Sequence, residues 1–302
     1  MYEKFFSFTE KPFNTTPDSK FFFPSVKHLE ALNSLRYAID ERKGFVVITG
    51  EIGAGKTTVC RTLLNQLDIN TKVGLVTNTH LTKRELLATI LDEFEIEYKS
   101  GSKQKLLSLL NQYLIKQLAQ DMNIVLIIDE AQNLTPSVLE EVRMLSNLET
   151  EKEKLIQIIL MGQPQLKAKL ENPKLEQFKQ RIAVYYHLES LSKDETQEYI
   201  SHRLKLASSN GTLEIFDKTA IDLIYAYSRG VPRLINLVCD SALLSGYVLD
   251  TKQITEKIIA DVIKERQITE TVPAEGGALV HPIGQGASDP AEWTVPNRIN
   301  IN

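Results

Sequence analysis

The stretch Gly50-Glu51-Ile52-Gly53-Ala54-Gly55-Lys56-Thr57 decides the fold of this chain. It fits the pattern G-x-x-x-x-G-K-[ST], in which glycines allow a tight turn and successive backbone N–H groups point inward, toward phosphate oxygens. The apolar run Phe45–Thr49 precedes the motif and a helical pattern over Lys56–Leu67 follows it. This order of strand, loop and helix predicts a phosphate-binding loop at the N-terminus of a helix.

The residue types in the loop indicate ATP and Mg²⁺ as its ligands. Lys56 is expected to contact the β- and γ-phosphates, and Thr57 is expected to be a ligand of Mg²⁺. The other expected nucleotide contacts come from the rest of the loop and the first helical turn, namely Gly50, Glu51, Ile52, Gly53, Ala54, Gly55 and Thr58.

A second candidate element is the acidic pair that follows the apolar run Ile124–Ile128. A buried strand of a parallel sheet would bring Asp129 to the same edge as the phosphate loop, where it can bind Mg²⁺ through water. Glu130, one residue further, can orient and polarise the attacking water. The pair therefore predicts hydrolysis of ATP to ADP and phosphate.

Three other polar residues are candidates for contacts with the nucleotide. Gln163 follows the apolar run Leu155–Leu160 and could contact the γ-phosphate or the water, or be a simple turn residue. Arg181 could reach across a subunit interface toward transition-state charge, or form a surface salt bridge. Arg233 begins a helix and could point at the nucleotide, or be an ordinary first-turn charge.

Apolar runs that alternate with helical patterns predict an α/β fold with right-handed crossovers. The predicted sheet is parallel and five-stranded, with helices on both faces, and it belongs to a P-loop ATPase domain over residues 45–190. The five expected strands are Phe45–Thr49, Lys72–Asn78, Asn123–Ile128, Leu155–Leu160 and Val184–Leu188. From Ser192 the pattern becomes helical only, which predicts a helical domain over residues 191–267.

The two ends of the chain differ from these domains in composition. Residues 1–44 contain many aromatic residues interrupted by prolines, followed by an amphipathic pattern over Val26–Asp40. We expect this segment to pack on the ATPase core, since so many aromatic side chains would not remain in water. Residues 268–302 are rich in glycine, proline and small polar residues, and we expect a disordered tail there.

The overall composition is that of an ordinary globular protein. The 302 residues carry a formal net charge of −4, so a chain dominated by binding to nucleic acid or membrane surfaces is not indicated. The two cysteines, Cys60 and Cys239, lie in apolar surroundings and predict buried thiols. The five histidines show no metal-ligand spacing, and no apolar run is long enough to span a membrane. We therefore expect a cytoplasmic protein.

These motifs resemble those of AAA+ ATPases with a helical lid, in particular at residues 129–134 and at Gly230-Val231-Pro232-Arg233. Longer strings resemble the general secretion pathway protein A (ExeA-type) family over residues 1–265. The strings are Lys11-Pro12-Phe13 to Thr16-Pro17-Asp18, Asn147–Thr150, Gln157–Pro164, Gln180-Arg181-Ile182, Pro232–Asn236 and Cys239-Asp240.

The resemblance implies an ATPase that forms homo-oligomers, as a ring or partial ring. Such a protein would drive assembly of a type II secretion, pilus or exopolysaccharide system together with envelope-assembly proteins. Within the family pattern, Gln163 corresponds to sensor 1, Arg181 to the arginine finger and Arg233 to sensor 2. Secretion-type members continue into a membrane span and a peptidoglycan-binding domain, which this sequence does not contain. We therefore expect attachment to the inner membrane only peripherally, through a partner.

Two alternatives remain from the sequence. The chain also resembles, more loosely, AAA+ regulators of transposition, which assemble on DNA and recruit a transposase. The lysines and arginines that would have to form a DNA-binding stripe are interspersed with acids, so the protein-assembly function is preferred. An ATP-binding scaffold with negligible turnover is the second alternative, and Glu130 argues against it.

Overall fold

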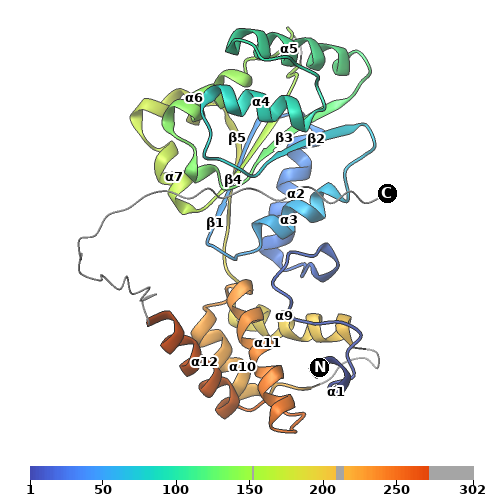
Figure 1. Ribbon diagram of the computed structural model, residues 1–302, viewed down its shortest axis with the longest axis vertical. Coiled ribbons are helices and arrows are strands. Elements are labelled where there is room, and N and C mark those ends of the chain that lie inside the picture. The colour runs from blue at the N-terminus through green and yellow to red at the C-terminus, as the bar shows by residue number, and fades with distance from the viewer. Residues whose placement is uncertain (152, 209–213, 272–302) are drawn as a thin grey trace, which may run out of the picture.

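The computed structural model describes residues 1–151, 153–208 and 214–271. Its sheet and the helices around it form one part of the molecule, and a helical part lies beneath it in Figure 1. The sheet has five strands in the order β2-β3-β4-β1-β5, and all four neighbouring pairs are parallel. The strands are β1 (Phe45–Gly50), β2 (Thr71–Val76), β3 (Asn123–Ile128), β4 (Gln157–Gly162) and β5 (Ile182–Leu188).

The burial of the strands explains this order. The three central strands β1, β3 and β4 are apolar and buried almost throughout. The edge strand β5 alternates between half-buried and exposed residues, and the edge strand β2 combines buried and half-buried residues with the exposed Lys72. Continuous apolar runs are typical of parallel strands covered on both faces. The predicted five-stranded parallel α/β sheet is confirmed.

Helices cover both faces of the sheet because successive side chains of a strand point to opposite sides. One apolar cluster joins Val46, Ile48 and Ile127 to α2 and α3, and the other joins Val47 and Leu126 to the helices of the opposite face. The helices around the sheet are α2 (Val26–Asp40), α3 (Lys56–Leu64), α4 (Lys83–Glu93), α5 (Lys103–Leu118), α6 (Pro136–Leu145), α7 (Pro164–Leu170) and α8 (Glu176–Lys179), with short 3₁₀ turns η2 (Ala131–Asn133) and η3 (Pro173–Leu175).

The helices that follow β5 form the lid, which has an apolar cluster of its own. They are α9 (Lys193–Ala207), α10 (Lys218–Ser228), α11 (Pro232–Val248) and α12 (Glu256–Thr271). The predicted tail was expected to begin at residue 268, but α12 continues to Thr271, so residues 268–271 are helical. The rest of the predicted tail, 272–302, lies outside the described residues.

The N-terminal aromatic residues pack on the lid, which corrects the expectation that the whole segment 1–44 packs on the ATPase core. The buried side chains belong to the lid cluster, and the ring of Phe13 meets that of Phe216 edge-on at 6.1 Å. The members are Tyr2, Phe6, Phe8, Phe13 and Phe21, around α1 (Tyr2–Phe5) and η1 (Ser19–Phe21). Within residues 1–44, α2 packs against the sheet, and Phe22 packs against the same cluster. The composition required an apolar surface for these rings but did not specify which one.

Two smaller expectations can be compared with the structure. Cys60 and Cys239 are both free and buried, as expected. None of the helices in the described part of the chain is long and apolar enough to cross a membrane.

Phe13→Ala should destabilise the protein by about 3 kcal/mol, because it removes a fully buried ring from a packed cluster. Urea denaturation followed by circular dichroism would measure the loss. Val26→Ala is the control, since that side chain is 64% exposed and its loss should cost less than about 0.5 kcal/mol. Equal, small effects of the two substitutions would contradict the packing of the segment on the lid.

Candidate active site

The carboxyl ends of β1, β3 and β4 meet at one edge of the sheet, where a cavity of about 390 Å³ lies between the sheet and the lid. The phosphate loop follows β1, Asp129 and Glu130 follow β3, and Gln163 follows β4. The lid contributes Arg233 to the same cavity. The structure therefore brings together the predicted residues from four separate parts of the chain.

The loop can follow its path only because it contains glycines. Gly53 and Gly55 have φ angles of +81° and +103°, in the left-handed region that favours glycine. A Cβ atom on Gly53 would lie 2.5 Å from Cβ of Arg233, and one on Gly55 would lie 2.8 Å from Nε2 of His28. The loop is thus enclosed by the lid on one side and by α2 on the other.

Lys56 lies inside the loop and is only 7% exposed. Its Nζ donates hydrogen bonds to the backbone oxygens of Gly50 at 2.7 Å and Glu51 at 3.0 Å. Burial lowers the pKa of Lys56, while the negative charges of Glu130 and Asp129 raise it. A buried ammonium group surrounded by carbonyl oxygens is well placed to exchange them for phosphate oxygens.

Thr57 and Asp129 supply the oxygen ligands expected of a Mg²⁺ site. The Thr57 hydroxyl donates to Oδ2 of Asp129 at 3.4 Å. In the described residues no group of three or more His, Cys, Asp or Glu side chains could bind a metal. Mg²⁺ usually takes one or two protein ligands and completes its shell with phosphate and water, so Thr57 and Asp129 could hold it.

Glu130 is held in a defined orientation by two amide side chains. Its backbone is left-handed, with φ of +50°, a strained conformation for a residue other than glycine. Gln163 Nε2 donates to Glu130 Oε2 at 3.2 Å, and Gln132 Nε2 donates to the same oxygen. Gln132 also accepts a bond from the Gln163 backbone N–H at 3.0 Å through its Oε1. The contact between Gln132 and Glu130 was not predicted, although the position of Gln132 two residues after Glu130 indicates that its side chain can reach the carboxylate.

His28 is a second residue whose position at the site was not predicted. It is buried, and its Nε2 lies 3.0 Å from the Ala54 backbone oxygen while Nδ1 lies 2.8 Å from Ser25 Oγ. Since a carbonyl oxygen only accepts, Nε2 carries the hydrogen. Burial lowers the pKa of His28, so the ring is neutral at physiological pH. No spacing in the sequence indicates this contact between α2 and the loop.

Arg233 is a lid residue that borders the phosphate loop. Its backbone N–H donates to the Gly53 oxygen at 3.2 Å, and its side chain lines the cavity beside Pro232 and Asn236. The N-terminal segment also lines this cavity, which the sequence did not predict. The lining residues are Asn14, Thr15, Thr16, Pro17, Asp18, Phe21, Phe22 and Phe23.

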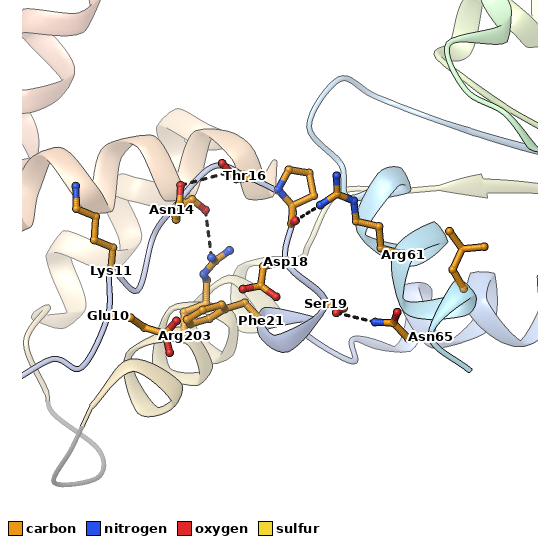
Figure 2. A pocket seen from close by; sticks show the side chains of 12 residues that line it. Glu10, Lys11, Asn14, Thr16, Asp18, Ser19, Phe21, Arg61, Asn65 and Arg203 are labelled. Atoms are coloured by element: carbon orange, nitrogen blue, oxygen red, sulfur yellow. Dashed lines mark hydrogen bonds between the residues drawn. The ribbon is translucent and has the colours of Figure 1, made fainter. Parts of the chain in front are cut away.

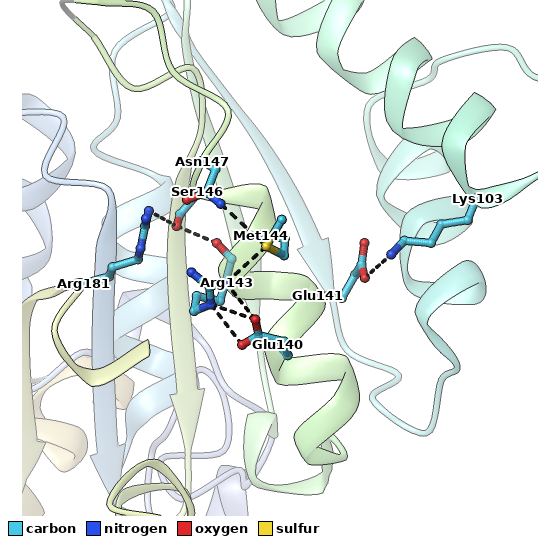
Figure 3. Close-up of polar contacts among 8 residues, drawn as sticks. All are labelled: Lys103, Glu140, Glu141, Arg143, Met144, Ser146, Asn147 and Arg181. Carbon is cyan, nitrogen blue, oxygen red and sulfur yellow. Dashed lines mark hydrogen bonds and ion pairs between the residues drawn. The ribbon is translucent and has the colours of Figure 1, made fainter. Parts of the chain in front are cut away.

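Arg181 is not brought to the cavity of its own chain. It precedes β5, whose first residue Ile182 pairs with Phe45 at the start of β1, whereas the phosphate loop follows the end of β1. The six residues of β1 separate the two sites by about 20 Å. Arg181 Nη1 donates to Ser146 Oγ at 3.1 Å, beside the end of α6 (Figure 3).

Comparison with known proteins agrees with this architecture. A family model described as an AAA domain matches residues 39–170. General secretion pathway protein A of Aeromonas hydrophila is 43% identical over 255 residues, which make up 84% of this chain and 46% of the relative. The chain thus spans about half the length of that curated relative.

Solved structures show the same fold at low identity. Cdc6p of Pyrobaculum aerophilum has a TM-score of 0.62 at 17% identity, covering 85% of this chain and 74% of that one. The ORC2 protein of Aeropyrum pernix has a TM-score of 0.63 at 13% identity, covering 88% and 75%. The RuvB Holliday junction branch migration motor of Thermotoga maritima has a TM-score of 0.54 at 17% identity, covering 81% and 70%.

The phosphate loop, the parallel sheet and the helical lid place this chain in the AAA+ class of P-loop NTPases. Within that class, it resembles the general secretion pathway protein A (ExeA-type) family.

Asp129→Asn should stabilise the nucleotide-free protein, and more so as the pH rises from about 3.5 to 7. Burial raises the pKa of Asp129, and the charge of Glu130 adds to this, while hydrogen bonds and Lys56 oppose it. A raised folded-state pKa contributes stability below the unfolded value of about 4. That stability is lost as the pH rises through the folded value. Asparagine does not titrate, so the variant does not lose stability at this position as the pH rises.

Thermal melting across this pH range, without nucleotide, would measure the effect. The exposed Asp68→Asn is the matched control. A variant that melts below the wild type at pH 7, with a difference that does not depend on pH, would contradict this account of Asp129.

Proposed function

We propose that the protein binds ATP with Mg²⁺ and hydrolyses it to ADP and phosphate. The observation that carries the proposal is the convergence of Lys56, the Thr57–Asp129 pair and the Glu130–Gln163 pair on one cavity. The loop amides and Lys56 would bind the phosphates, and Thr57 and Asp129 would bind the metal ion. Mg²⁺, when bound, neutralises charge on the β- and γ-phosphates.

Glu130 is the proposed general base. Gln132 and Gln163 both donate to Oε2 and so orient the carboxylate. We therefore assign Oε1 as the atom that accepts the proton of the attacking water. Gln163 is also near enough to act as a sensor, because a contact with the γ-phosphate would compete with its bond to Glu130. Arg233 connects the state of the loop to the lid through its bond to Gly53.

Glu130→Gln should lower ATP turnover by at least about a hundredfold while nucleotide binding remains, because an amide cannot accept the proton. Phosphate release measures turnover, and a fluorescent nucleotide measures binding. Glu198→Gln is the control, since that carboxylate is exposed on α9 and lines neither this cavity nor that of Arg181. Turnover that is unchanged in Glu130→Gln would contradict the assigned base.

We further propose that Arg181 acts in the site of a neighbouring copy. It lines a cavity of about 590 Å³ at the opposite edge of the sheet, together with Lys43, Arg143 and Lys154. Arg143 and Lys154 form ion pairs with Glu140 and Glu149, whereas the hydrogen bond of Arg181 goes to the neutral Ser146 hydroxyl. Arg181 can therefore exchange this bond for a phosphate oxygen more readily than its neighbours.

Mixing two inactive variants tests this arrangement. Arg181→Ala keeps Glu130, and Glu130→Gln keeps Arg181, so a mixed oligomer would contain complete sites. An equal mixture should regain about a quarter of wild-type turnover if neighbours combine at random and the finger acts in trans. Lys154→Gln, in the same cavity, should keep most of its turnover. A mixture as inactive as its two components would refute action in trans.

We propose assembly of a secretion or envelope system as the biological role, supported by the identity to general secretion pathway protein A. Light scattering with and without ATP and duplex DNA separates this role from the DNA-bound regulator. Assembly driven by ATP and indifferent to DNA supports it. Assembly nucleated by DNA at moderate salt would replace it with the regulator of transposition.

A further inference from the structure

Residues 9–25, here called the strap, connect the aromatic residues on the lid to α2 of the ATPase core. The strap contacts both parts of the molecule and lines the nucleotide cavity over residues 14–18 and 21–23. At its N-terminal end, the Thr9 N–H donates to the Ala207 oxygen at 2.8 Å. At its C-terminal end, Ser25 caps α2 and contacts His28.

On the lid side, Arg203 of α9 fastens the strap. Its side chain is buried, with 6% of the residue exposed. Its Nε donates to the Pro12 oxygen, its Nη2 donates to the Asn14 oxygen at 3.2 Å, and its Nη1 donates to the Tyr199 hydroxyl at 2.7 Å. The guanidinium also lies 4.7 Å from the centre of the Phe21 ring. One planar group thus fixes two backbone oxygens and a ring of the strap.

On the core side, α3 fastens the same strap. Arg61 Nη1 donates to the Pro17 oxygen, and Asn65 Nδ2 donates to Ser19 Oγ at 2.9 Å. Because α3 is the helix that begins at Lys56, the strap is attached to the element that carries the phosphate loop. Figure 2 shows these contacts and that of Arg203 around one hollow.

That hollow is a cavity of about 580 Å³ that adjoins the nucleotide cavity. Asn14, Thr16, Pro17, Asp18, Phe21 and Arg203 line both. The phosphate loop occupies one side of the nucleotide cavity, so the strap faces the part of a nucleotide that projects from the phosphates. The base and ribose of the nucleotide would therefore meet the strap.

We infer that Arg203 is a positioning residue for the nucleoside half of ATP and that the strap transmits nucleotide occupancy from the core to the lid. Arg203 sets the place of Asn14 and Phe21, which in turn bound the space for base and ribose. This inference rests on the proposed binding of ATP. It assigns to Arg203 a function separate from that of Arg233, which contacts the phosphate loop itself.

The experiment compares two ligands that share their phosphates. Arg203→Gln and Arg203→Lys are titrated with ATP and with inorganic tripolyphosphate, each with Mg²⁺, by calorimetry. The affinity for ATP should fall about tenfold, because two of the strap's anchoring hydrogen bonds are lost or misplaced. The affinity for tripolyphosphate should stay within about twofold of the wild type, because the loop is unchanged.

Two further variants keep the test informative if a change at buried Arg203 prevents folding. Arg61→Gln removes the exposed core-side anchor and should weaken ATP binding about threefold, again without affecting tripolyphosphate. Lys193→Gln is the control: Lys193 is also on α9 but outside the strap and both cavities, and the change removes an exposed ion pair with Asp222. It should leave both affinities unchanged.

Amide hydrogen exchange of residues 12–23 is a second readout. Saturating ATP should slow exchange in the wild type, and this protection should be lost in Arg203→Gln even at saturation. A wild type that binds neither ligand would refute the proposed function itself. A wild type that binds both, with Arg203 variants that lose neither ligand or lose both equally, would refute the positioning role alone.

Discussion

The parallel pairing of β1, β3 and β4 is the constraint on which the site depends. The register places Thr49 beside Gly162 and Ile128 beside Leu160, so the three strands end at nearly the same level. The phosphate loop, the acidic pair and Gln163 each follow directly from one of these ends. A shift of one residue in any pairing would turn the side chains to the opposite faces of the sheet and separate the groups. The continuous apolar burial of these strands therefore determines the positions of the site residues as well as the fold.

The site contains features that lower the stability of the protein and suit it for binding. Lys56 is buried and Asp129 is half-buried, and burial lowers the pKa of Lys56 and raises the pKa of Asp129. Glu130 has a left-handed backbone, and its carboxylate lies near both charges. A buried charge without a full set of partners is costly, but phosphates and a cation would complete each set. We regard these missing partners as the source of the affinity for a charged ligand.

The sequence predicted the sheet and the central residues of the site because they depend on local patterns. The phosphate loop is contiguous, and Asp129 and Glu130 follow an apolar strand of recognisable length. The contacts of His28 and the strap could not be predicted, since they join segments distant in the sequence. The aromatic side chains near the N-terminus indicated that the segment is buried, but composition does not show which surface it packs on. In the structure that surface is the lid. Gln132 lay within reach of sequence reasoning, because a two-residue offset across the turn brings its amide to Glu130.

The lid and the core are linked by two short routes that both begin at the proposed nucleotide, namely Arg233 at the phosphate loop and the strap at the nucleoside. Both connections can respond to a nucleotide only if the cavity binds one through its phosphates. The most direct test is a calorimetric titration of the wild type and Lys56→Ala with ATP and Mg²⁺. The account predicts saturable binding of about one nucleotide per chain that is reduced at least about a hundredfold in Lys56→Ala. Equal binding by the two proteins, or no binding by the wild type, would contradict it.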